Sequence, residues 1–389
     1  MCNPNIAIVV VGYNRVDSLA RLLDTLDKAY YPQVAVPLII SIDKSDTDAV
    51  ERYADGFDWQ HGSKQVVKHE QRMGLRNHIL SLGQHFDHYD ALVVLEDDLS
   101  VSPNFYLYAM QAVEKYHDDD RIAGISLFSF AINYQTGHFF QPIKDHNDVY
   151  FMNCAQSWGQ VWMKRQWLRF YEWYNDHTHF PQQSPLLPPY ICTWPATSWL
   201  KYHTRYCAEE NLYFVYPYVA YTTNNGDTGT HNGGSYINLN QERLQRGRIT
   251  TLRLPHFDEE ETVCYDVFFE NKKLAQVLNL DDDQCCVDLN GERGNRENKR
   301  YWLTTKQCNY KICRQFGVRY RPIDENIYAA TPGCEIYLYD TTQVAENTFK
   351  RTFSHLLYDI RIDTISRVIR TYGKKRAIRE AIKRLFRRK

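Results

Sequence analysis

The sequence lacks the glycine-rich loops with which many α/β proteins hold phosphates. No Gly-x-Gly-x-x-Gly follows the first apolar run, Ile6 to Val11, and no Walker loop occurs in the 389 residues. These absences argue against a dinucleotide enzyme and against an NTPase, because both classes bind pyrophosphate through such a loop. If the protein binds a nucleotide, its phosphates need a metal ion together with Arg or Lys side chains.

Paired cysteine knuckles and a leader segment are also missing. The ten cysteines include the adjacent Cys285 and Cys286, and four residues separate Cys308 from Cys313, but none has the Cys-x-x-Cys spacing of structural zinc sites. The first residues carry no basic segment or cleavage site, and Ile6 to Val11 is far too short to span a bilayer. We therefore expect a cytoplasmic protein with reduced thiols and no structural zinc.

Net charge is nearly absent, at −1, but the balance hides an asymmetry. Residues 361–389 contain twelve Lys and Arg against Asp363 and Glu380, which gives +10 here and leaves −11 for the first 360 residues. Apolar residues recur at helical spacing in this segment, so we expect a basic amphipathic helix of the kind that lies on an anionic membrane surface. A helix packed on its own domain and a nucleic-acid-binding tail are the alternatives. Aromatics are not interleaved with the basic residues apart from Tyr372 and Phe386, so no nucleic acid is expected as a partner.

Short apolar runs alternate with helical patterns over the first hundred residues. Strands are predicted at Ile6–Val11, Pro37–Ile42, Val66–His69 and Leu92–Leu95, and helices follow the first strand and precede the last. Unbroken apolar runs indicate strands that are buried on both faces. The alternation predicts an α/β fold with a doubly wound, mostly parallel sheet.

Three adjacent carboxylates, Glu96, Asp97 and Asp98, follow the last of these strands directly. They repel one another and lose hydration at the end of a buried strand, so a positive group is expected beside them. Mg²⁺ and Mn²⁺ prefer carboxylate oxygens and often complete their shell with substrate phosphates. A solvated acidic turn is the alternative interpretation.

Further polar residues favour the metal site over a solvated turn. Arg15, Asp43 and Arg76 lie at the ends of other predicted strands or in the loops beyond them. In a doubly wound sheet these positions line the ligand crevice. The sequence therefore predicts a site for a nucleotide and a divalent metal at this edge of the sheet.

Four stretches carry a resemblance to a known family: Ile6–Arg15, Ile40–Asp43, Arg72–Asn77 and Val93–Phe105. Together they resemble the nucleotide-sugar domain of GT-A glycosyltransferases. The Glu-Asp-Asp-Leu-x-x-x-Pro-x-Phe stretch is most similar to the N-acetylglucosaminyltransferase I type. Residues 157–163, followed by Trp167, resemble the Trp-Gly-x-x-x-Trp segment of bacterial family 2 enzymes that build surface polysaccharides. The resemblance spans about residues 5–235.

This resemblance implies a GT-A fold and a role for each matching residue in the first hundred. Asp98 would ligate the Mn²⁺ or Mg²⁺ ion that bridges the diphosphate, while Glu96 and Asp97 would contact ribose or sugar hydroxyls. Asp43 would bind the nucleobase, with a strand-end turn as the alternative. Arg15 would contact base or phosphate, with a surface salt bridge as the alternative. Arg76 is a further candidate for donor binding.

Three later residues are also candidates for donor binding. Gly159 permits a close backbone approach, and the indole of Trp158 can stack on sugar C–H groups, although a core position is the alternative for this and the neighbouring tryptophans. Residues 222–234 form a polar, glycine-rich stretch that can act as a lid. Gly-Thr-His at 229–231 matches the loop that closes on the donor in these enzymes, which gives His231 a role at the metal or phosphates.

The catalytic base is where the sequence departs from the resemblance. In the N-acetylglucosaminyltransferase I type, the base is an Asp beside a Trp at the start of a helix, but the corresponding residues 194–199, Trp-Pro-Ala-Thr-Ser-Trp, contain no carboxylate. Asp227, in the lid, is the tentative substitute, with Glu209, Glu210 and Asp176 as further candidates. A simple turn role for Asp227 is the alternative.

The expected organisation has three parts: a GT-A catalytic domain over 1–236, an accessory or acceptor region over 237–360, and the basic helix over 361–389. The expected activity is inverting transfer of a sugar from a nucleotide-diphospho-sugar, with UDP favoured, to an acceptor hydroxyl in surface polysaccharide biosynthesis. The acceptor would be a saccharide or a polyprenyl-diphosphate-linked sugar at the inner face of the plasma membrane. A sugar-phosphate nucleotidyltransferase and a non-catalytic carbohydrate-binding or scaffold protein are the alternatives.

Overall fold

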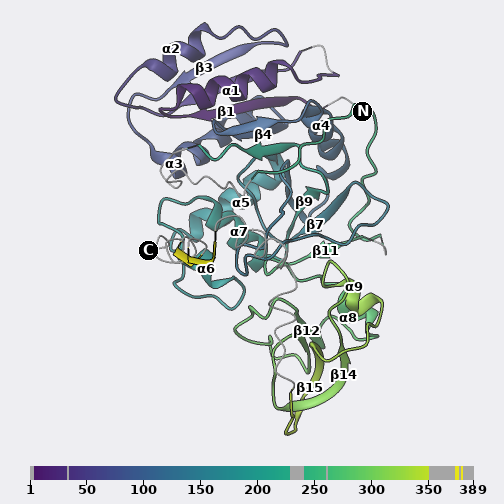
Figure 1. Cartoon of the computed structure of the whole chain (residues 1–389). Helices are drawn as coiled ribbons and strands as arrows, with labels where there is room; N and C mark the ends of the chain where they lie inside the picture. Colours follow the sequence, from purple (N-terminus) through teal and green to yellow (C-terminus); the bar gives the residue numbers. More distant parts are fainter. Residues whose placement is uncertain are drawn as a thin grey trace.

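The computed structural model describes residues 4–32, 35–227, 241–259, 262–349, 373–375 and 378–379. Its centre is a sheet whose described strands run in the order β11-β7-β9-β6-β8-β4-β1-β2-β3 (Figure 1). Five of the eight neighbouring strand pairs are parallel and three are antiparallel. The prediction of an α/β fold with a mostly parallel central sheet is therefore confirmed.

The first half of the sheet follows the strands expected from the sequence. Strand β1 (Ile6–Gly12) lies between β2 (Leu38–Ile42) and β4 (Ala91–Glu96), and β3 (Lys64–Lys68) forms the edge beside β2. All three of these pairings are parallel. The carboxyl ends of β1, β2 and β4 consequently meet at one edge of the sheet.

Helices bury both faces of this sheet. Alternate residues of β1 enter two separate cores: Ile8 packs with the leucines of α1 (Val16–Asp27), and Val9 packs with Ile79 of α3 (Gly74–Ser81). Burial of every β1 residue explains why this strand is an unbroken apolar run in the sequence. The other helices of this part are α2 (Ala49–Gly56), α4 (Phe105–Tyr116) and the short 3₁₀ helix Leu82–Asp87.

The second half of the sheet is mixed. It contains β6 (Ile122–Ser126), β7 (Val149–Met152), β8 (Gln160–Met163), β9 (Tyr213–Pro217) and β11 (Cys264–Tyr265). Strand β8 runs antiparallel to both of its neighbours, β4 and β6. The helices of this part are α5 (Lys164–Asp176), α6 (Pro189–Cys192) and α7 (Leu200–Glu209).

The tryptophans around β8 belong to the core. Trp162 lies on β8 and Trp167 on α5, and their rings stack with centroids 3.8 Å apart. Both are almost fully buried. The core interpretation is thus correct for these two residues.

A small two-stranded sheet joins the acidic turn to a later part of the chain. Strand β5 (Leu99–Val101) starts directly after Asp98 and pairs antiparallel with β10 (Thr222–Asn224). The backbone N–H of Asn225 also donates a hydrogen bond of 2.9 Å to the carbonyl of Asp98. Residues more than a hundred positions apart are therefore brought to the same place.

Residues 274–344 form a smaller module beneath the β11 end of the sheet (Figure 1). Its strands β12 (Cys285–Asp288), β13 (Tyr301–Thr304), β14 (Tyr310–Phe316) and β15 (Ile336–Val344) are ordered β12-β13-β15-β14. Together with α8 (Leu274–Val277) and α9 (Glu325–Tyr328) they enclose a hydrophobic core of their own. Strand β11 belongs to the central sheet although it follows residue 236 in the chain. The domain boundary expected at residue 236 stays a prediction.

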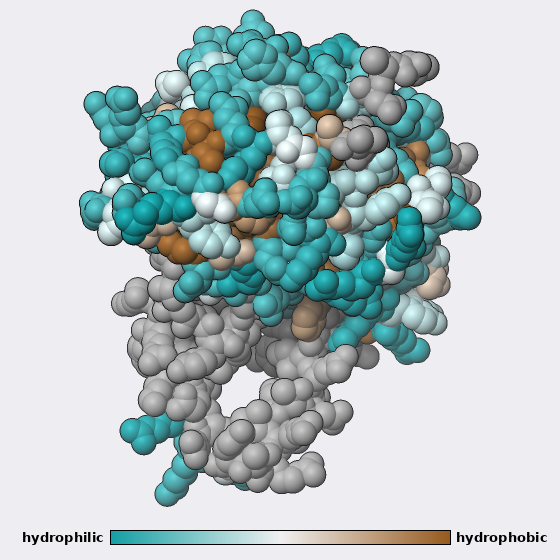
Figure 2. Space-filling model, turned by 90° about the horizontal axis from the view of Figure 1, so that it is seen from above, coloured by the Kyte–Doolittle hydropathy of each residue, from teal (hydrophilic) through white to brown (hydrophobic). Residues whose placement is uncertain are grey.

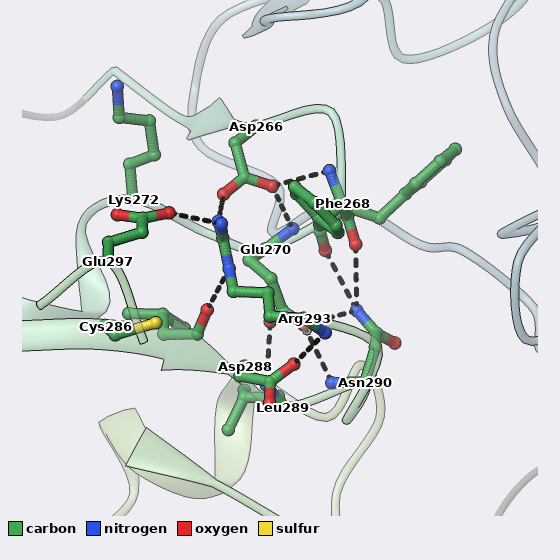
Figure 3. Close-up of polar contacts among 12 residues, drawn as sticks. Asp266, Phe268, Glu270, Lys272, Cys286, Asp288, Leu289, Asn290, Arg293 and Glu297 are labelled. Carbon is green, nitrogen blue, oxygen red and sulfur yellow. Dashed lines mark hydrogen bonds and ion pairs between the residues drawn. The ribbon is translucent and has the colours of Figure 1, made fainter. Parts of the chain in front are cut away.

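A buried charge network lies where this module meets the central domain (Figure 3). The guanidinium of Arg293, with a side chain only 10% exposed, pairs with Asp266 and Glu297. Glu270 accepts hydrogen bonds from the backbone N–H groups of Leu289 (2.9 Å) and Asn290 (2.8 Å). Burial, followed by the nearby charges of Asp288 and Asp266, raises the pKa of Glu270 well above its usual range.

The remaining expectations concern thiols and the membrane. The nine cysteines in the described ranges are free thiols. Within the same ranges no helix has the length and apolar character needed to cross a bilayer. The expected basic helix over 361–389 lies almost wholly outside the described residues. On the face shown in Figure 2, hydrophilic side chains predominate and apolar ones form small separate patches.

Replacing Arg293 with Met should destabilise the protein by about 3–5 kcal/mol, because it leaves the mostly buried carboxylate of Asp266 without its ion-pair partner. The free energy of unfolding in urea measures this loss. The matched control is Arg314→Met, whose guanidinium is exposed and lies over the Phe316 ring, and it should change stability by less than about 0.5 kcal/mol. Equal unfolding midpoints for the two variants would contradict the prediction.

Asp324 should make stability depend on pH. Its Oδ2 accepts a 2.6 Å hydrogen bond from the hydroxyl of Tyr265, and burial raises the pKa of Asp324 to about 6. Between pH 4 and pH 6 the carboxyl of Asp324 is protonated in the folded state but ionised in the unfolded chain. Its contribution to the free energy of unfolding is therefore fully present below about pH 4 and is lost as pH rises through about 6. Over this pH interval the free energy of unfolding of wild type should fall by about 2–3 kcal/mol relative to that of Asp324→Asn. Urea unfolding of both proteins at pH 4 to 7 measures the difference, and a difference that does not vary with pH would contradict the prediction.

Candidate functional site

A cavity of about 270 Å³ lies beyond the carboxyl ends of β1, β2 and β4. The loop after β1 contributes residues 12–15, the end of β2 contributes Asp43, and the turn after β4 contributes residues 96–98. Residues from three other segments complete the wall: Arg72, Gly74, Leu75, His78, Thr197 and Asp227. The topology therefore places the ends of three parallel strands around one cavity, as doubly wound sheets do.

Six of the residues expected at the site line this cavity: Arg15, Asp43, Glu96, Asp97, Asp98 and Asp227. The lining residues that were not named as site candidates from the sequence include Tyr13, Arg72, His78 and Thr197. Tyr13 and Arg72 stand inside the stretches that carry the family resemblance, so their positions were a usable signal. Thr197 belongs to the 194–199 segment that precedes α7 (Leu200–Glu209).

The acidic turn is electrostatically strained. Burial, together with the charges of Asp98 and Asp97, raises the pKa of Glu96 to about 8. Burial also raises the pKa of Asp97 to about 6, although Arg15 opposes this shift. The guanidinium of Arg15 pairs with Asp97 and, at 3.3 Å, with Asp98. One arginine thus faces three carboxylates, and the turn retains a deficit of positive charge.

Asp98 has an oxygen available for a cation. Its Oδ2 accepts from Arg15, but its Oδ1 is buried and has no hydrogen-bond partner. A buried carboxylate oxygen without a partner is costly, and a hard cation would satisfy it. No group of three or more His, Cys, Asp or Glu side chains in the described ranges is arranged to enclose an ion. The donor set therefore fits a cation that takes only one or two protein carboxylates and completes its shell with other oxygens, as Mg²⁺ and Mn²⁺ do.

Asp43 fixes the loop that borders the cavity. Its carboxylate accepts hydrogen bonds from the backbone N–H groups of Lys44 (2.9 Å), Met73 (2.7 Å) and Gly74 (2.9 Å). Each carboxylate oxygen can accept more than one hydrogen bond, so Asp43 can hold this loop and still accept from a ligand. The strand-end turn and the ligand contact are therefore compatible.

The side of the cavity near Asp43 also holds aromatic and cationic groups. The guanidinium of Arg72 lies over the ring of Tyr13, 5.0 Å from its centroid, and makes no ion pair with any described residue. His78 Nε2 is 2.7 Å from the hydroxyl of Ser41, and burial, helped by His69, lowers the pKa of His78 to about 4. At neutral pH the cavity is therefore lined here by one cation and one neutral imidazole.

Three expected site residues do not line this cavity. Arg76 is directed toward α7, where it donates to the carbonyl of Ala196 (3.0 Å) and lies over the ring of Tyr202. Trp158 and Gly159 lie beside β10, where Thr222 Oγ1 donates a 2.5 Å hydrogen bond to the Trp158 carbonyl. His231 lies outside the described residues.

Gly159 has a conformation that other residues rarely adopt. Its φ angle is +93°, and a Cβ atom there would lie 2.7 Å from Thr222 Cγ2. The Gly159 carbonyl also accepts a 2.9 Å hydrogen bond from Leu127 N–H. Glycine is thus required both by backbone conformation and by the close approach of β10.

Asp227 is held in place by the first helix. Its Oδ2 accepts a 2.7 Å hydrogen bond from the Ser18 hydroxyl and pairs with Arg21. Ser18 and Arg21 therefore anchor one oxygen of this carboxylate. Glu209, an alternative from the sequence, pairs with Arg205 at 2.7 Å, and it does not line the cavity.

Comparison with known proteins finds weak structural likeness. No family model and no curated protein matches the sequence. One similar solved structure is a mannosyltransferase from Pyrobaculum calidifontis in complex with GDP-Man and Mn²⁺, with a TM-score of 0.34, 12% identity and coverage of 56% of this chain and 57% of that one. Another is S. aureus TarS 1-349 in complex with UDP-GlcNAc, with a TM-score of 0.38, 13% identity and coverage of 60% and 62%.

A third is GalNAc-T7 with UDP, GalNAc and Mn²⁺, with a TM-score of 0.38, 13% identity and coverage of 56% of this chain and 43% of that one. This chain thus spans less than two thirds of each of these three solved chains. Likeness at this level does not assign the chain to a family.

Gly159→Ala should destabilise the protein by about 2–3 kcal/mol, because it combines a strained φ angle with a clash against Thr222. Gly137→Ala is the matched control, since Gly137 also has a positive φ (+73°) but has no atom within 4 Å of an added Cβ. The free energy of unfolding of Gly137→Ala measures the backbone strain alone, and the additional loss in Gly159→Ala measures the clash with Thr222. A loss no larger at 159 than at 137 would show that β10 can retreat from the added methyl group.

Proposed function

We propose that this protein is a metal-dependent glycosyltransferase that uses a nucleotide-diphospho-sugar, with a UDP-sugar favoured. The observation that carries the proposal is the cavity at the ends of β1, β2 and β4, where three adjacent carboxylates meet Arg15 and Arg72. A nucleotide diphosphate needs positive charge at its phosphates and polar groups at its base and ribose. Both kinds of group line this cavity, and the resemblance to GT-A enzymes gives each a role.

The surroundings of the three adjacent carboxylates suggest a different role for Asp98 than for Glu96 and Asp97. Asp98, with its partnerless Oδ1, would hold Mn²⁺ or Mg²⁺, and Glu96 and Asp97 would accept from ribose or sugar hydroxyls. The metal, when bound, neutralises charge on the diphosphate as the bond to the sugar breaks. Arg15 orients Asp97 and Asp98 through its ion pairs, and Arg72 can bind a phosphate oxygen because no described carboxylate occupies it.

The nucleobase end of the site is assigned to Asp43. Its carboxylate can accept from a base N–H while it holds the 73–74 backbone. The ring of Tyr13 beside Arg72 offers a stacking surface at the same end of the cavity. Arg76 would act indirectly, by holding the 194–199 segment against the site through the Ala196 carbonyl.

Trp158 and Gly159, which the sequence predicts to bind the donor, do not line the cavity. We therefore assign them to the acceptor side, with His231 closing on the donor. Transfer would be inverting, with the acceptor hydroxyl attacking the anomeric carbon opposite the leaving diphosphate. The pathway proposed is surface polysaccharide biosynthesis with a saccharide or polyprenyl-diphosphate-linked acceptor, and residues 361–389 would hold the enzyme at the inner membrane face. The resemblance to family 2 enzymes and the basic composition of the tail support these points.

One observation favours a non-catalytic carbohydrate-binding or scaffold protein as the second candidate. The segment 194–199 lacks a carboxylate, and Asp227 is already engaged by Ser18 and Arg21. A sugar-phosphate nucleotidyltransferase is less well supported, because it needs a glycine-rich basic loop after β1, where this chain has Gly-Tyr-Asn-Arg. Turnover of a bound donor separates an enzyme from a scaffold.

Isothermal titration with UDP-, GDP-, dTDP- and CMP-sugars, in Mn²⁺ or in EDTA, tests the proposal. We expect one donor to bind with Mn²⁺, and Asp98→Asn to weaken binding by at least about tenfold, equivalent to the loss of one charge-assisted contact. Asp118→Asn is the matched control, because its side chain is 81% exposed and pairs only at the surface. Failure of every donor to bind in Mn²⁺ would refute the transferase and favour the scaffold.

A further inference from the structure

The segment just after residue 240 is held against β10. The backbone N–H of Glu242 donates a 2.7 Å hydrogen bond to Thr223 Oγ1, and Leu244 forms a parallel bridge with Ala220. The backbone N–H of Gln245 donates a 2.9 Å hydrogen bond to the Ala220 carbonyl. Glu242 is thus fixed at one position along β10.

That position is close to the acidic turn. Thr223 pairs with Ser100 of β5, two residues after Asp98, and side chains opposite each other in an antiparallel pair lie about 5 Å apart. The end of β10 contacts the turn directly, through the hydrogen bond from Asn225 to Asp98. Glu242 is therefore one strand away from the cavity without lining it.

The charge of Glu242 acts on two tyrosines. Burial, together with this charge, raises the pKa values of Tyr134 and Tyr150 above their ordinary range, although hydrogen bonds with Ser129 and Phe130 oppose the shift of Tyr150. The ring of Tyr134 packs edge-on against Trp158 at 6.1 Å, and Trp158 packs against Phe128 at 4.9 Å. Aromatic faces beside a carboxylate suit a sugar, whose C–H faces stack on rings and whose hydroxyls donate to oxygen.

Glu242 also has a free acceptor atom. Its Oε1 is buried and has no hydrogen-bond partner, and burial raises the pKa of Glu242 to about 7, opposed by Arg243. A general base works best when its pKa is near the working pH. Asp227, by contrast, offers an oxygen that already accepts from Ser18 and Arg21.

We infer that Glu242 is the general base that takes the proton of the acceptor hydroxyl, in an acceptor site walled by Tyr134 and Trp158. This inference rests on the proposed transferase function and supplies the carboxylate that residues 194–199 lack. The acceptor oxygen forms the bond to the anomeric carbon, and its proton passes to Glu242. The bond between that carbon and the nucleotide diphosphate breaks, and the diphosphate leaves with the electron pair.

The test compares wild type with Glu242→Gln, which keeps the shape of the side chain but cannot accept the proton. With the donor found by titration, transfer to aryl glycosides of glucose, galactose and N-acetylglucosamine is measured together with hydrolysis of the donor. We expect kcat to fall by about 10²–10⁴-fold. The Kd of the donor should stay within about twofold, because Glu242 does not line the donor cavity.

The pH profile separates catalysis from a structural role. Wild-type kcat/KM should fall on the acidic side of about pH 7, where Glu242 becomes protonated, and this limb should be missing in Glu242→Gln. The facing groups are Tyr134, Tyr150 and Arg243, and the two tyrosines stay neutral over this interval because their pKa values are raised. Glu242→Asp, which retains a carboxylate, should recover part of the rate and the acidic limb.

Several outcomes would overturn the inference. Unchanged turnover in Glu242→Gln, an acidic limb that persists in it, or loss of donor binding would each do so. So would a wild type that binds a donor but neither transfers nor hydrolyses it. If the acidic limb disappears in Asp227→Asn and remains in Glu242→Gln, Asp227 is the base. Absence of any donor binding by wild type is a different result, since it refutes the proposed function itself.

Discussion

The structure depends on an unbalanced electrostatic interaction at the end of β4. Three carboxylates follow a buried strand, and one arginine from the neighbouring β1 loop faces them. The apolar strand fixes where the turn lies, and the parallel pairing of β1 with β4 brings Arg15 to it. Because the positive charge supplied by the chain is insufficient, the turn remains suited to an additional cation. The same strand that stabilises the core thus creates the demand for a ligand.

The acidic turn is also the point where distant segments meet. Strand β5 carries the chain away from Asp98 into the pairing with β10, and β10 in turn contacts both the Trp158–Gly159 backbone and Glu242. The cavity and Glu242 therefore lie near the same short two-stranded sheet, so a small displacement of β10 would alter both at once.

The sequence predicted the parallel half of the fold well, because β1, β2 and β4 are buried on both faces and read as unbroken apolar runs. It also placed six residues that share the cavity, since the carboxyl ends of parallel strands meet. The mixed half was harder to predict, because its strands are short, such as the four-residue β8. Glu242 carried no local signal, since only the tertiary fold brings it near the acidic turn.

The two residues of β11 have a consequence for how the chain can be divided. They form the outermost pairing of the central sheet, alongside β7, and belong to the same stretch of chain that enters the smaller module. The hydroxyl of Tyr265, in β11, donates a hydrogen bond to Asp324 of that module. A chain that stopped at the end of the family resemblance would present β7 as a bare sheet edge, a template for self-association. Strand β11 therefore covers an edge of the central sheet that β7 would otherwise expose.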